Sequence, residues 1–315
     1  IEKIAVLFSD LGFKTLMARI KNLLQIAPEV DLESLIQNIS KEEVEEASVL
    51  LWLLESERTN ATLGDIVDYG RARFDTSDFF AIKKQLQERI EKTGQLKSVY
   101  EEIEQPLQKV ITYMNALGIK LDVDYLKTLS EKMHAELETL QTKIYQEAGQ
   151  EFNINSPKQL GEILFDKLGL KPKNQKKTEG GQRSTKESEL EKMREMHAII
   201  PSLLRYRELQ KLVSTYVDAL PAQVSEDGRI RTTFLQTGSV TGRMASKNPG
   251  LQNIPIRTEE SKSIRRGFVA SEGYTMVGID YSQIELRVAA IMSHDAKMVD
   301  IFKRGEDVHT GVAVR

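Results

Sequence analysis

The chain has 315 residues, enough for two or three domains that each bury a core, and its 40% hydrophobic and 29% charged residues are typical of a soluble globular protein. It contains no cysteine and no run of about eighteen apolar residues, which excludes disulfides, thiolate chemistry and a membrane-spanning helix. The 44 basic and 47 acidic residues leave a net charge of −3, so the chain as a whole is not a strongly basic protein.

The first two predicted helices lie near the N-terminus. Residues 2–24 carry leucine and isoleucine at helical spacing, and a second helix over about 41–56 ends in the apolar run ASVLLWLLE. Acidic residues inside the first apolar stretch argue against a signal peptide, and we expect a cytoplasmic protein. Because the sequence begins with Ile1 rather than methionine, we also expect it to be part of a longer product.

Two longer helices follow. Residues 99–116 predict a helix that Gly118 ends, and the next helix ends near Gly149. A narrow apolar stripe, with steps of three and four residues, runs along this second helix and favours a pair of long packed helices. The stripe consists of Leu126, Leu129, Met133, Leu137, Leu140 and Ile144.

A shorter helix and a basic loop come next. Ser156 is expected to cap the helix that Pro157 opens and Gly169 ends. The loop at 171–186 has six Lys/Arg residues against one Glu, and it is the predicted tip of a helical hairpin. A solvated surface is the alternative interpretation, and for one such loop alone it is favoured.

The returning arm of the hairpin is helical again. Ser184 and Glu187 have the spacing of a capping box, which predicts a helical run toward Pro201. The stretch after that proline, LLRYRELQKLVSTYVDAL, resumes as helix.

The pattern changes near residue 229. GRIRTTFLQ alternates like a strand, 265–270 and 274–280 predict two short strands, and 282–294 predicts a helix. A second cationic segment, 243–266, carries six Lys/Arg residues against two acids. The sequence therefore predicts an α+β, mostly helical fold with a small sheet near the C-terminus.

Asp280 stands where the apolar strand ends and the helix begins, among neighbours that suggest a buried acid. Asp and Ser are favoured at helix starts, and Ser282 and Glu285 fit a capping box, so a structural role accounts for these residue types. A carboxylate at a strand end can also hold a divalent metal on a rigid scaffold. Both interpretations stay open on these residues alone.

The stretch VGIDYSQIELR resembles the first catalytic aspartate motif of the family A DNA polymerases, the bacterial DNA polymerase I type. TGRMASKNPGLQNIPIR resembles the segment that precedes this motif, and GEDVHTGVA resembles the start of the fingers. Upstream, NINSPKQLGEILFDKLGL, KKTEGGQRST and YRELQKLVSTYVDALP are similar to the thumb. The resemblance covers residues 100–315 in the order of the family.

The resemblance implies a site for a deoxynucleoside triphosphate (dNTP) and a pair of Mg²⁺ ions. Asp280 is implied as one of two aspartates that hold the ions, with the backbone carbonyl of Tyr281 as a further ligand. Glu285 is implied to exclude a ribose 2′-hydroxyl, unless it serves as a capping-box partner. Gln283 and His309 are implied to contact the dNTP, although a lone histidine is more often an incidental residue.

The resemblance also implies binding of primer–template DNA. The residues that match positions near the primer terminus are Arg243, Gln252, Asn253 and Arg257, with ordinary turn chemistry as the alternative for part of the run. The residues that match backbone contacts in the thumb are Lys211, Ser214 and Thr215. The residues of the hairpin tip expected over the minor groove are Lys176, Lys177, Arg183, Ser184 and Thr185. A solvated helix face is the alternative for any single lysine.

The resemblance divides the chain into six parts. They are residues 1–25 for the end of a 5′ nuclease-like region, 26–98 for a vestigial 3′–5′ exonuclease-like helical region, 99–120 for the start of the palm, 121–221 for the thumb, 222–290 for the palm with the first catalytic aspartate motif, and 291–315 for the start of the fingers. The rest of the fingers and the second catalytic aspartate are expected beyond residue 315, as a continuation or a second chain. We therefore expect the 315 residues alone not to polymerise.

The absence of proofreading is a further expectation. Residues 1–20 resemble the C-terminal end of a 5′ nuclease region, and 48–70 resemble the last helices of a 3′–5′ exonuclease domain. Only some twenty-five residues remain between them, too few for the sheet of an exonuclease domain. FDTSDF carries Asp75 and Asp78, but their spacing is wrong for the metal pair of such an enzyme and no apolar strand precedes them.

The predicted function is template-directed DNA synthesis in the cytoplasm, in association with the nucleoid. A non-catalytic DNA-binding scaffold derived from a polymerase is the alternative, and Asp280 and Glu285 argue against it. Synthesis of RNA is disfavoured because Glu285 is of the type that selects deoxynucleotides.

Overall fold

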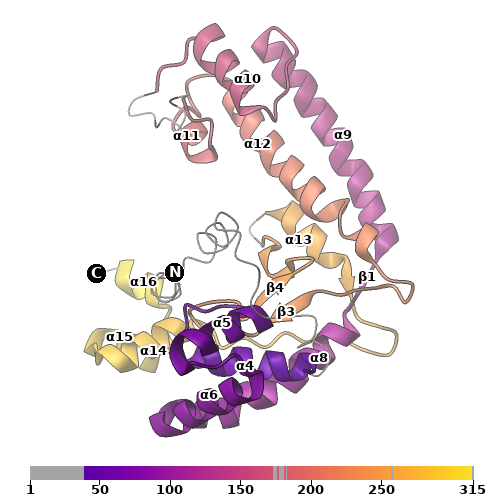
Figure 1. Cartoon of the computed structure of the whole chain (residues 1–315). Helices are drawn as coiled ribbons and strands as arrows, with labels where there is room; N and C mark the ends of the chain where they lie inside the picture. The colour runs from indigo at the N-terminus through magenta and orange to yellow at the C-terminus, as the bar shows by residue number, and fades with distance from the viewer. Residues whose placement is uncertain (1–38, 173–175, 177–180, 182, 257, 314–315) are drawn as a thin grey trace. The chain divides into compact units, whose positions relative to one another are not determined.

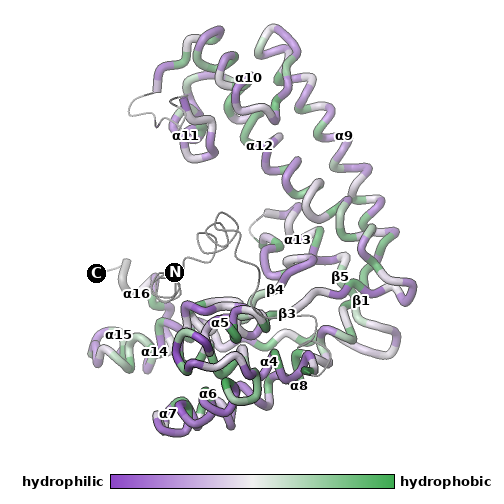
Figure 2. Tube along the Cα trace, in the orientation of Figure 1, coloured by the Kyte–Doolittle hydropathy of each residue, from purple (hydrophilic) through white to green (hydrophobic). Residues whose placement is uncertain are grey.

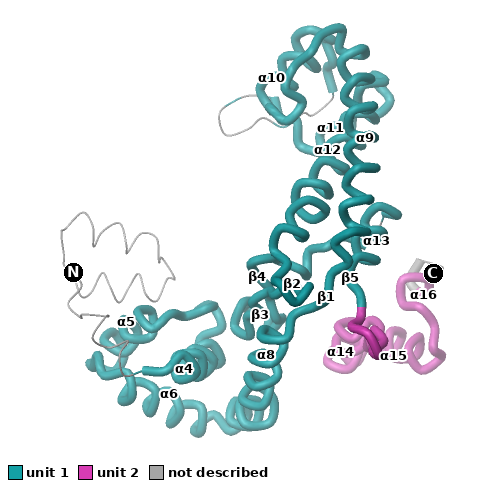
Figure 3. The backbone as a smooth tube through the Cα atoms, turned by 90° about the vertical axis from the view of Figure 1, so that its right-hand side faces the viewer, with its two compact units in different colours: residues 1–269 teal, residues 270–315 magenta. Residues whose placement is uncertain are grey.

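The computed structural model describes residues 39–172, 176, 181, 183–256 and 258–313, and it divides the chain into two compact units (Figure 3). The first unit is Ile1–Val269 and the second is Ala270–Arg315. The helix expected over 2–24 lies outside the described residues. No helix in the described ranges is long and apolar enough to cross a membrane.

The first described part is a group of three helices, α4 (Lys41–Leu54), α5 (Leu63–Phe74) and α6 (Phe79–Thr93). The first two begin with complete capping boxes, which supply partners for the free N–H groups of their first turns. The helices enclose a core of their own, which includes Leu50, Ile66 and Ile82. The helix predicted near 41–56 is therefore confirmed.

Both aspartates of FDTSDF lie at helix ends. Asp75 adopts a left-handed conformation with φ 53° after α5. Asp78 caps α6, where its Oδ1 accepts a hydrogen bond from the N–H of Ala81 at 2.6 Å. These positions account for both residues by capping.

A continuous helical stretch leads from this core into the first sheet. It consists of α7 (Gln95–Val99), the π-helical turn η1 (Tyr100–Glu104) and α8 (Gln105–Leu117). Gly118 ends it with φ +65°, and a Cβ at this position would lie 2.6 Å from the carbonyl oxygen of Ile230. The predicted helix and its glycine stop are confirmed.

The long helix α9 (Val123–Ala148) packs along α12 (Ile199–Leu212) and the π-helical turn η3 (Val213–Val217), as Figure 1 shows. Hydrophobic and hydrophilic residues alternate along α9 (Figure 2). All six residues of the predicted stripe pack in one core, four of them buried and Leu129 and Leu140 at its edge. The prediction of paired long helices is confirmed, and we call α9, α12 and η3 the hairpin.

The far end of the hairpin is made of α10 (Pro157–Gly161), the π-helical turn η2 (Glu162–Lys167) and α11 (Glu187–Glu191). Ser156 caps α10 as predicted, accepting from the N–H of Gln159 at 3.4 Å. The capping box predicted for Ser184 and Glu187 is wrong. Lys186 is the N-cap of α11, and the hydroxyl of Ser184 accepts instead from the N–H of Lys186 at 3.3 Å.

The hairpin returns to two small antiparallel sheets. In the first, β1 (Ile119–Leu121) lies between β2 (Arg229–Ile230) and β5 (Phe268–Val269), with Lys120 opposite Arg229 and Val269. In the second, β3 (Thr233–Leu235) pairs with β4 (Ala245–Lys247). The short helices η4 (Pro221–Gln223), η5 (Leu251–Asn253) and α13 (Glu259–Arg266) connect these strands. The strand predicted from 265 starts only at Phe268, because α13 continues to Arg266.

The second unit contains α14 (Ile284–Ser293), α15 (Ala296–Lys303) and α16 (Val308–Ala313). The guanidinium of Arg287 lies over the ring of Phe302 at 4.7 Å and joins the first two helices. The strand predicted over 274–280 is not formed, and Ile279 is 92% exposed. An apolar strand needs a neighbour for its backbone and side chains, and no described strand pairs with this segment.

Candidate nucleic-acid interface

Three of the predicted DNA contacts lie on one exposed side of the hairpin. Lys211 lies in the last turn of α12 and is exposed, and so are Ser214 and Thr215 in η3. The hydroxyl of Ser214 donates to the backbone carbonyl of Gln210 at 2.8 Å, so its oxygen keeps its acceptor capacity. The cation of Lys211 and the hydroxyl of Thr215 are suited to phosphate oxygens, whereas the Ser214 hydroxyl would first have to release its hydrogen from the Gln210 carbonyl.

A buried tyrosine ties this part of the hairpin to the segment that follows β4. Tyr216, in the same turn η3, donates its hydroxyl hydrogen to the backbone carbonyl of Asn253 at 2.6 Å. Burial raises the pKa of the Tyr216 hydroxyl, so the group stays a neutral donor. The structure thus brings the predicted contact Asn253 close to the exposed residues of η3.

The segment from 243 to 256 is held by its own side chains. Gln252 donates its side-chain amide to the carbonyl of Met244, and its backbone N–H contacts the hydroxyl of Ser246 at 3.4 Å. Arg243, Gln252 and Asn253 are all exposed. Arg257 lies outside the described residues.

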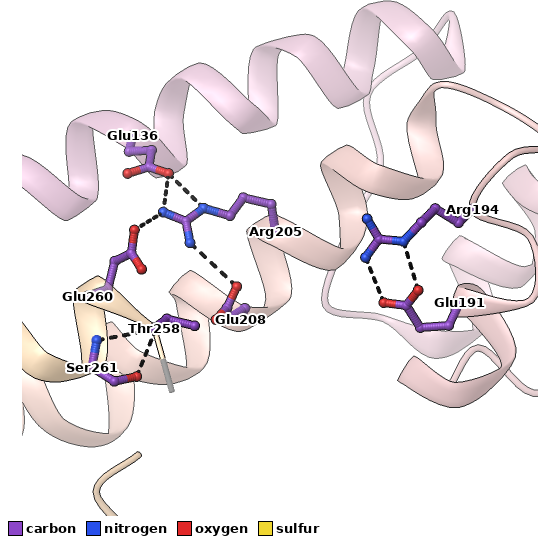
Figure 4. Close-up of polar contacts among 8 residues, drawn as sticks. All are labelled: Glu136, Glu191, Arg194, Arg205, Glu208, Thr258, Glu260 and Ser261. Carbon is purple, nitrogen blue, oxygen red and sulfur yellow. Dashed lines mark hydrogen bonds and ion pairs between the residues drawn. The ribbon is translucent and has the colours of Figure 1, made fainter. Parts of the chain in front are cut away.

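Arg205 joins three helices next to this segment. Figure 4 shows its guanidinium between Glu136 of α9, Glu208 of α12 and Glu260 of α13. Its Nη2 lies 2.5 Å from Glu260 and its Nε 2.9 Å from Glu136. The hydrogen bond to Glu260 raises the pKa of Arg205 and lowers the pKa of the Glu260 carboxyl. No sequence pattern predicts this network, because Glu136 and Glu260 are far from Arg205 in the chain.

The hairpin tip differs from the prediction in two residues. Ser184 and Thr185 are 3% and 5% exposed, so the expectation that they face the minor groove is wrong. The N–H of Ser184 bonds to Lys176 and the carbonyl of Thr185 accepts from Arg207, which turns both residues inward. The residue types at 184 and 185 suggested an exposed helix start. Packing against the hairpin instead buries both side chains.

The cations of the tip also have structural partners. Arg183 is exposed, but it donates to Asp166 and lies over the ring of Phe165 at 4.6 Å. The backbone N–H of Lys176 donates to Glu189 at 3.2 Å, and the Lys176 side chain is exposed. Lys177 lies outside the described residues.

In the second unit, Asp280 and Tyr281 lie in an exposed segment without regular secondary structure. The expectation of a buried Asp280 is therefore wrong, for the same reason that its strand is not formed. The capping box predicted for Ser282 and Glu285 is also wrong. Gln283 occupies the N-cap position of α14 in a left-handed conformation, with φ 56° and no side-chain cap. Glu285 is thus not a capping-box partner.

The structure brings two of the predicted dNTP contacts together. The side-chain amide of Gln283 donates to Asp307, which also accepts from the N–H of Thr310 at 2.8 Å at the start of α16. The hydrogen bond from the Thr310 backbone, followed by that from Gln283, lowers the pKa of Asp307. His309 is exposed in this first turn. Asp307 was missed in the sequence, although its spacing from Thr310 is that of a helix cap.

The residues for a metal pair fit only in part. The Asp280 carboxylate and the Tyr281 carbonyl are oxygen ligands of the type that Mg²⁺ prefers. Within the described ranges, no three or more Asp, Glu, His or Cys side chains form a group that could hold a metal ion. These residues could thus supply one side of a site, and a second carboxylate would have to come from elsewhere.

Comparisons with known proteins agree with the arrangement. The family model "DNA polymerase family A" matches residues 123–315. A thermostable DNA polymerase I of Thermus thermophilus is 48% identical over 72% of the chain, and a DNA polymerase I of Synechocystis is 46% identical over 73%. The chain spans 27% and 23% of these relatives.

A solved structure is also similar. It is the POL domain of Pol1 from M. smegmatis in complex with DNA primer–template and dNTP. The TM-score is 0.75 with 32% sequence identity, and the match covers 85% of this chain and 49% of that one. The mostly helical architecture with small antiparallel sheets is confirmed by this likeness.

Proposed function

Because the chain belongs to DNA polymerase family A, we propose that it supplies the thumb and the first catalytic aspartate of a template-directed DNA polymerase. Its substrates would be primer–template DNA and dNTPs. The solved relative, which was captured with both, supports this proposal.

The observation that carries the DNA-binding part is the hydrogen bond between Tyr216 and Asn253. It fixes a turn with an exposed face, which includes Thr215, against a segment with exposed amides, which includes Gln252. We infer that the hairpin face contacts backbone phosphates while Arg243, Gln252 and Asn253 approach the minor groove near the primer terminus. Minor-groove acceptors are similar in all base pairs, so such contacts suit an enzyme that copies any sequence.

The chemistry would centre on Asp280. When bound, Mg²⁺ lowers the pKa of the primer 3′-hydroxyl and stabilises the negative charge of the leaving pyrophosphate. In this chain Asp280 and the Tyr281 carbonyl would provide ligands to it. Glu285 would exclude a ribose 2′-hydroxyl by its bulk, and His309 would donate to a phosphate oxygen of the dNTP. Gln283, held on Asp307, would help to set the position of His309.

We expect the 315 residues alone to bind DNA without copying it. They should bind primer–template DNA, because they include the hairpin with its exposed residues and the exposed side chains of Gln252 and Asn253 after β4. They should not extend a primer, because a single aspartate does not hold two ions. Extension by the purified chain alone would contradict the second expectation. Degradation of a mismatched primer 3′ end by the complete polymerase would contradict the expected lack of proofreading.

The decisive experiment uses a complete family A polymerase that contains this chain. Asp280→Ala should leave the Kd for primer–template DNA unchanged and lower the extension rate on the order of a thousandfold or more. Glu272→Ala removes an exposed carboxylate from the same unit and is the matched control, with extension expected at the rate of the parent. Unchanged extension in Asp280→Ala would favour the DNA-binding scaffold.

A further inference from the structure

The loop between β3 and β4, residues 236–244, carries Arg243 near its end and is held by helices that precede it by more than a hundred residues. Residues 26–98 resemble a vestigial region, for which the sequence predicts no role. The contacts of the loop indicate that this region has one.

Trp52 of α4 makes the first contact. Its indole Nε1–H donates to the backbone carbonyl of Ser239 at 2.9 Å, across 187 positions of sequence. The side chain is only 6% exposed, yet neither of the two hydrophobic clusters of the described residues includes it. Loss of a buried indole partner would leave a donor unsatisfied, so this bond defines the position of the Ser239 carbonyl.

Two further contacts fix the beginning of the loop. The backbone N–H of Asn60, between α4 and α5, donates to the carbonyl of Thr237 at 3.1 Å, and Thr237 is 6% exposed. The side-chain amide of Gln236 donates to the carbonyl of Glu104 at 2.8 Å. The loop is therefore anchored at 236, 237 and 239 by the helical part of the same unit.

The path from these anchors to Arg243 is short and structured. The hydroxyl of Ser239 accepts from the N–H of Thr241 at 3.2 Å and lies 2.8 Å from the Thr241 hydroxyl. At Gly238 a Cβ would lie 2.5 Å from the Cβ of Ala245, so the loop passes close to β4. These contacts reach Thr241, two residues before Arg243, so we expect a shift of the Ser239 carbonyl to displace the backbone that leads to Arg243.

We propose that Trp52 is a positioning residue for Arg243, and that the helical region α4–α6 holds the β3–β4 loop in its DNA-binding conformation. The inference rests on the proposed function, because it takes Arg243 as a contact to the primer–template duplex. It adds that the vestigial region contributes to DNA affinity, although Trp52 itself does not contact the DNA.

The test measures the Kd of the full 315-residue chain for a fluorescein-labelled primer–template duplex by anisotropy. Trp52→Phe keeps most of the ring and removes the donor, and Ser56→Ala, at an exposed position beyond the end of α4, is the matched control. We expect Trp52→Phe to weaken binding about three- to tenfold, the equivalent of one hydrogen bond, and Ser56→Ala to bind as the wild type. Unchanged binding in Trp52→Phe would overturn the inference.

A double-mutant cycle distinguishes this inference from the proposed function. Arg243→Ala alone should weaken binding, and Trp52→Phe should add little in the Arg243→Ala background. Wild-type affinity in Arg243→Ala would reject the DNA contact of Arg243, on which the inference depends. If Arg243→Ala weakens binding and Trp52→Phe raises the Kd by the same factor in that background as in the wild type, the two residues act independently. This result would agree with the proposed function and would reject the positioning role of Trp52.

Hydrogen exchange separates loop positioning from general loss of structure. In Trp52→Phe the amides of 237–243 should exchange faster, while those of α4 and α6 keep their protection. Faster exchange across α4 and α6 as well would show that Trp52 only stabilises the helical core, and would overturn the positioning role.

Discussion

Nη2 of Arg205 in α12 lies 2.5 Å from Oε1 of Glu260 in α13, although the two residues are 55 positions apart (Figure 4). The same guanidinium bonds to Glu136 of α9, so one side chain connects both arms of the hairpin to α13. The segment after β4 is therefore anchored twice, through Tyr216 to Asn253 on one side and through Arg205 to α13 on the other. Its geometry depends on the hairpin.

Arg205→Met should lower the free energy of unfolding by about 1–2 kcal/mol, because it keeps an apolar stem and leaves three carboxylates without their shared cation. Urea unfolding followed by circular dichroism measures the change. Arg194→Met is the matched control, since Arg194 forms a similar bidentate pair with Glu191 on an exposed surface. We expect no measurable loss there. Equal effects of the two substitutions would contradict the structural role of Arg205.

The stabilisation by Glu260 should depend on pH. The hydrogen bond from Arg205 lowers the pKa of this carboxyl below its ordinary 4.5, although partial burial opposes the shift. A depressed folded-state pKa gives stability that is fully present above pH 4.5 and is lost as the pH falls through the folded-state value. The difference in unfolding free energy between wild type and Glu260→Gln should thus be constant near neutral pH and shrink below pH 4.5. A difference that persists unchanged in acid would be inconsistent with the Arg205 pair.

Local patterns predicted much of the fold because local chemistry determines it. The apolar stripe of α9 follows from helical period, and its stop at Gly149 from left-handed φ. Ser156 caps its helix because a hydroxyl at that spacing needs only its own neighbours. The short strand β1 depends on a partner more than a hundred residues away, and β3 depends on one about a dozen residues away. These strands were only partly predicted.

The predictions that proved wrong have a different physical origin. Ser282 and Glu285 have the residue types of a capping box, but Gln283 takes a left-handed conformation that removes the geometry. Ser184 is polar yet buried, because contacts with the hairpin tip outweigh its preference for solvent. Contacts such as that of Trp52 with Ser239 join positions with no shared sequence pattern. Such tertiary relationships require the folded chain.

A tight contact at the base of the hairpin gives another prediction. A Cβ at Gly267, which follows α13, would lie 2.9 Å from the side chain of Leu126 in α9, and Leu126 is fully buried. Gly267→Ala should therefore cost about 1–3 kcal/mol by overpacking, and Leu126→Ala about 2–5 kcal/mol by leaving a cavity.

The combination of these two substitutions tests the contact directly. In the double variant the new methyl group partly fills the space left by the leucine, so its loss should be smaller than the sum of the single losses. Equilibrium unfolding of the four proteins gives the interaction energy. Additive losses would mean that the two side chains do not share this space.

Lys211 provides a test of the hairpin face that is independent of the catalytic site. Its ammonium is exposed at the end of α12, next to Ser214 and Thr215, and a phosphate contact there would release one counterion from the DNA. Lys211→Ala should weaken primer–template binding about three- to tenfold and reduce the slope of log Kd against log salt by about one. Anisotropy titrations at several salt concentrations measure both quantities.

The control for Lys211 must remove the same charge from another place. Lys84→Ala does so on the exposed side of α6, within the helical region that makes no proposed contact with DNA. If net charge alone governed affinity, both variants would bind equally weakly with the same salt slope. A slope that falls only in Lys211→Ala locates the phosphate contact on the hairpin, because counterion release depends on charges that touch the DNA rather than on the total. A slope unchanged in Lys211→Ala would remove this residue from the interface.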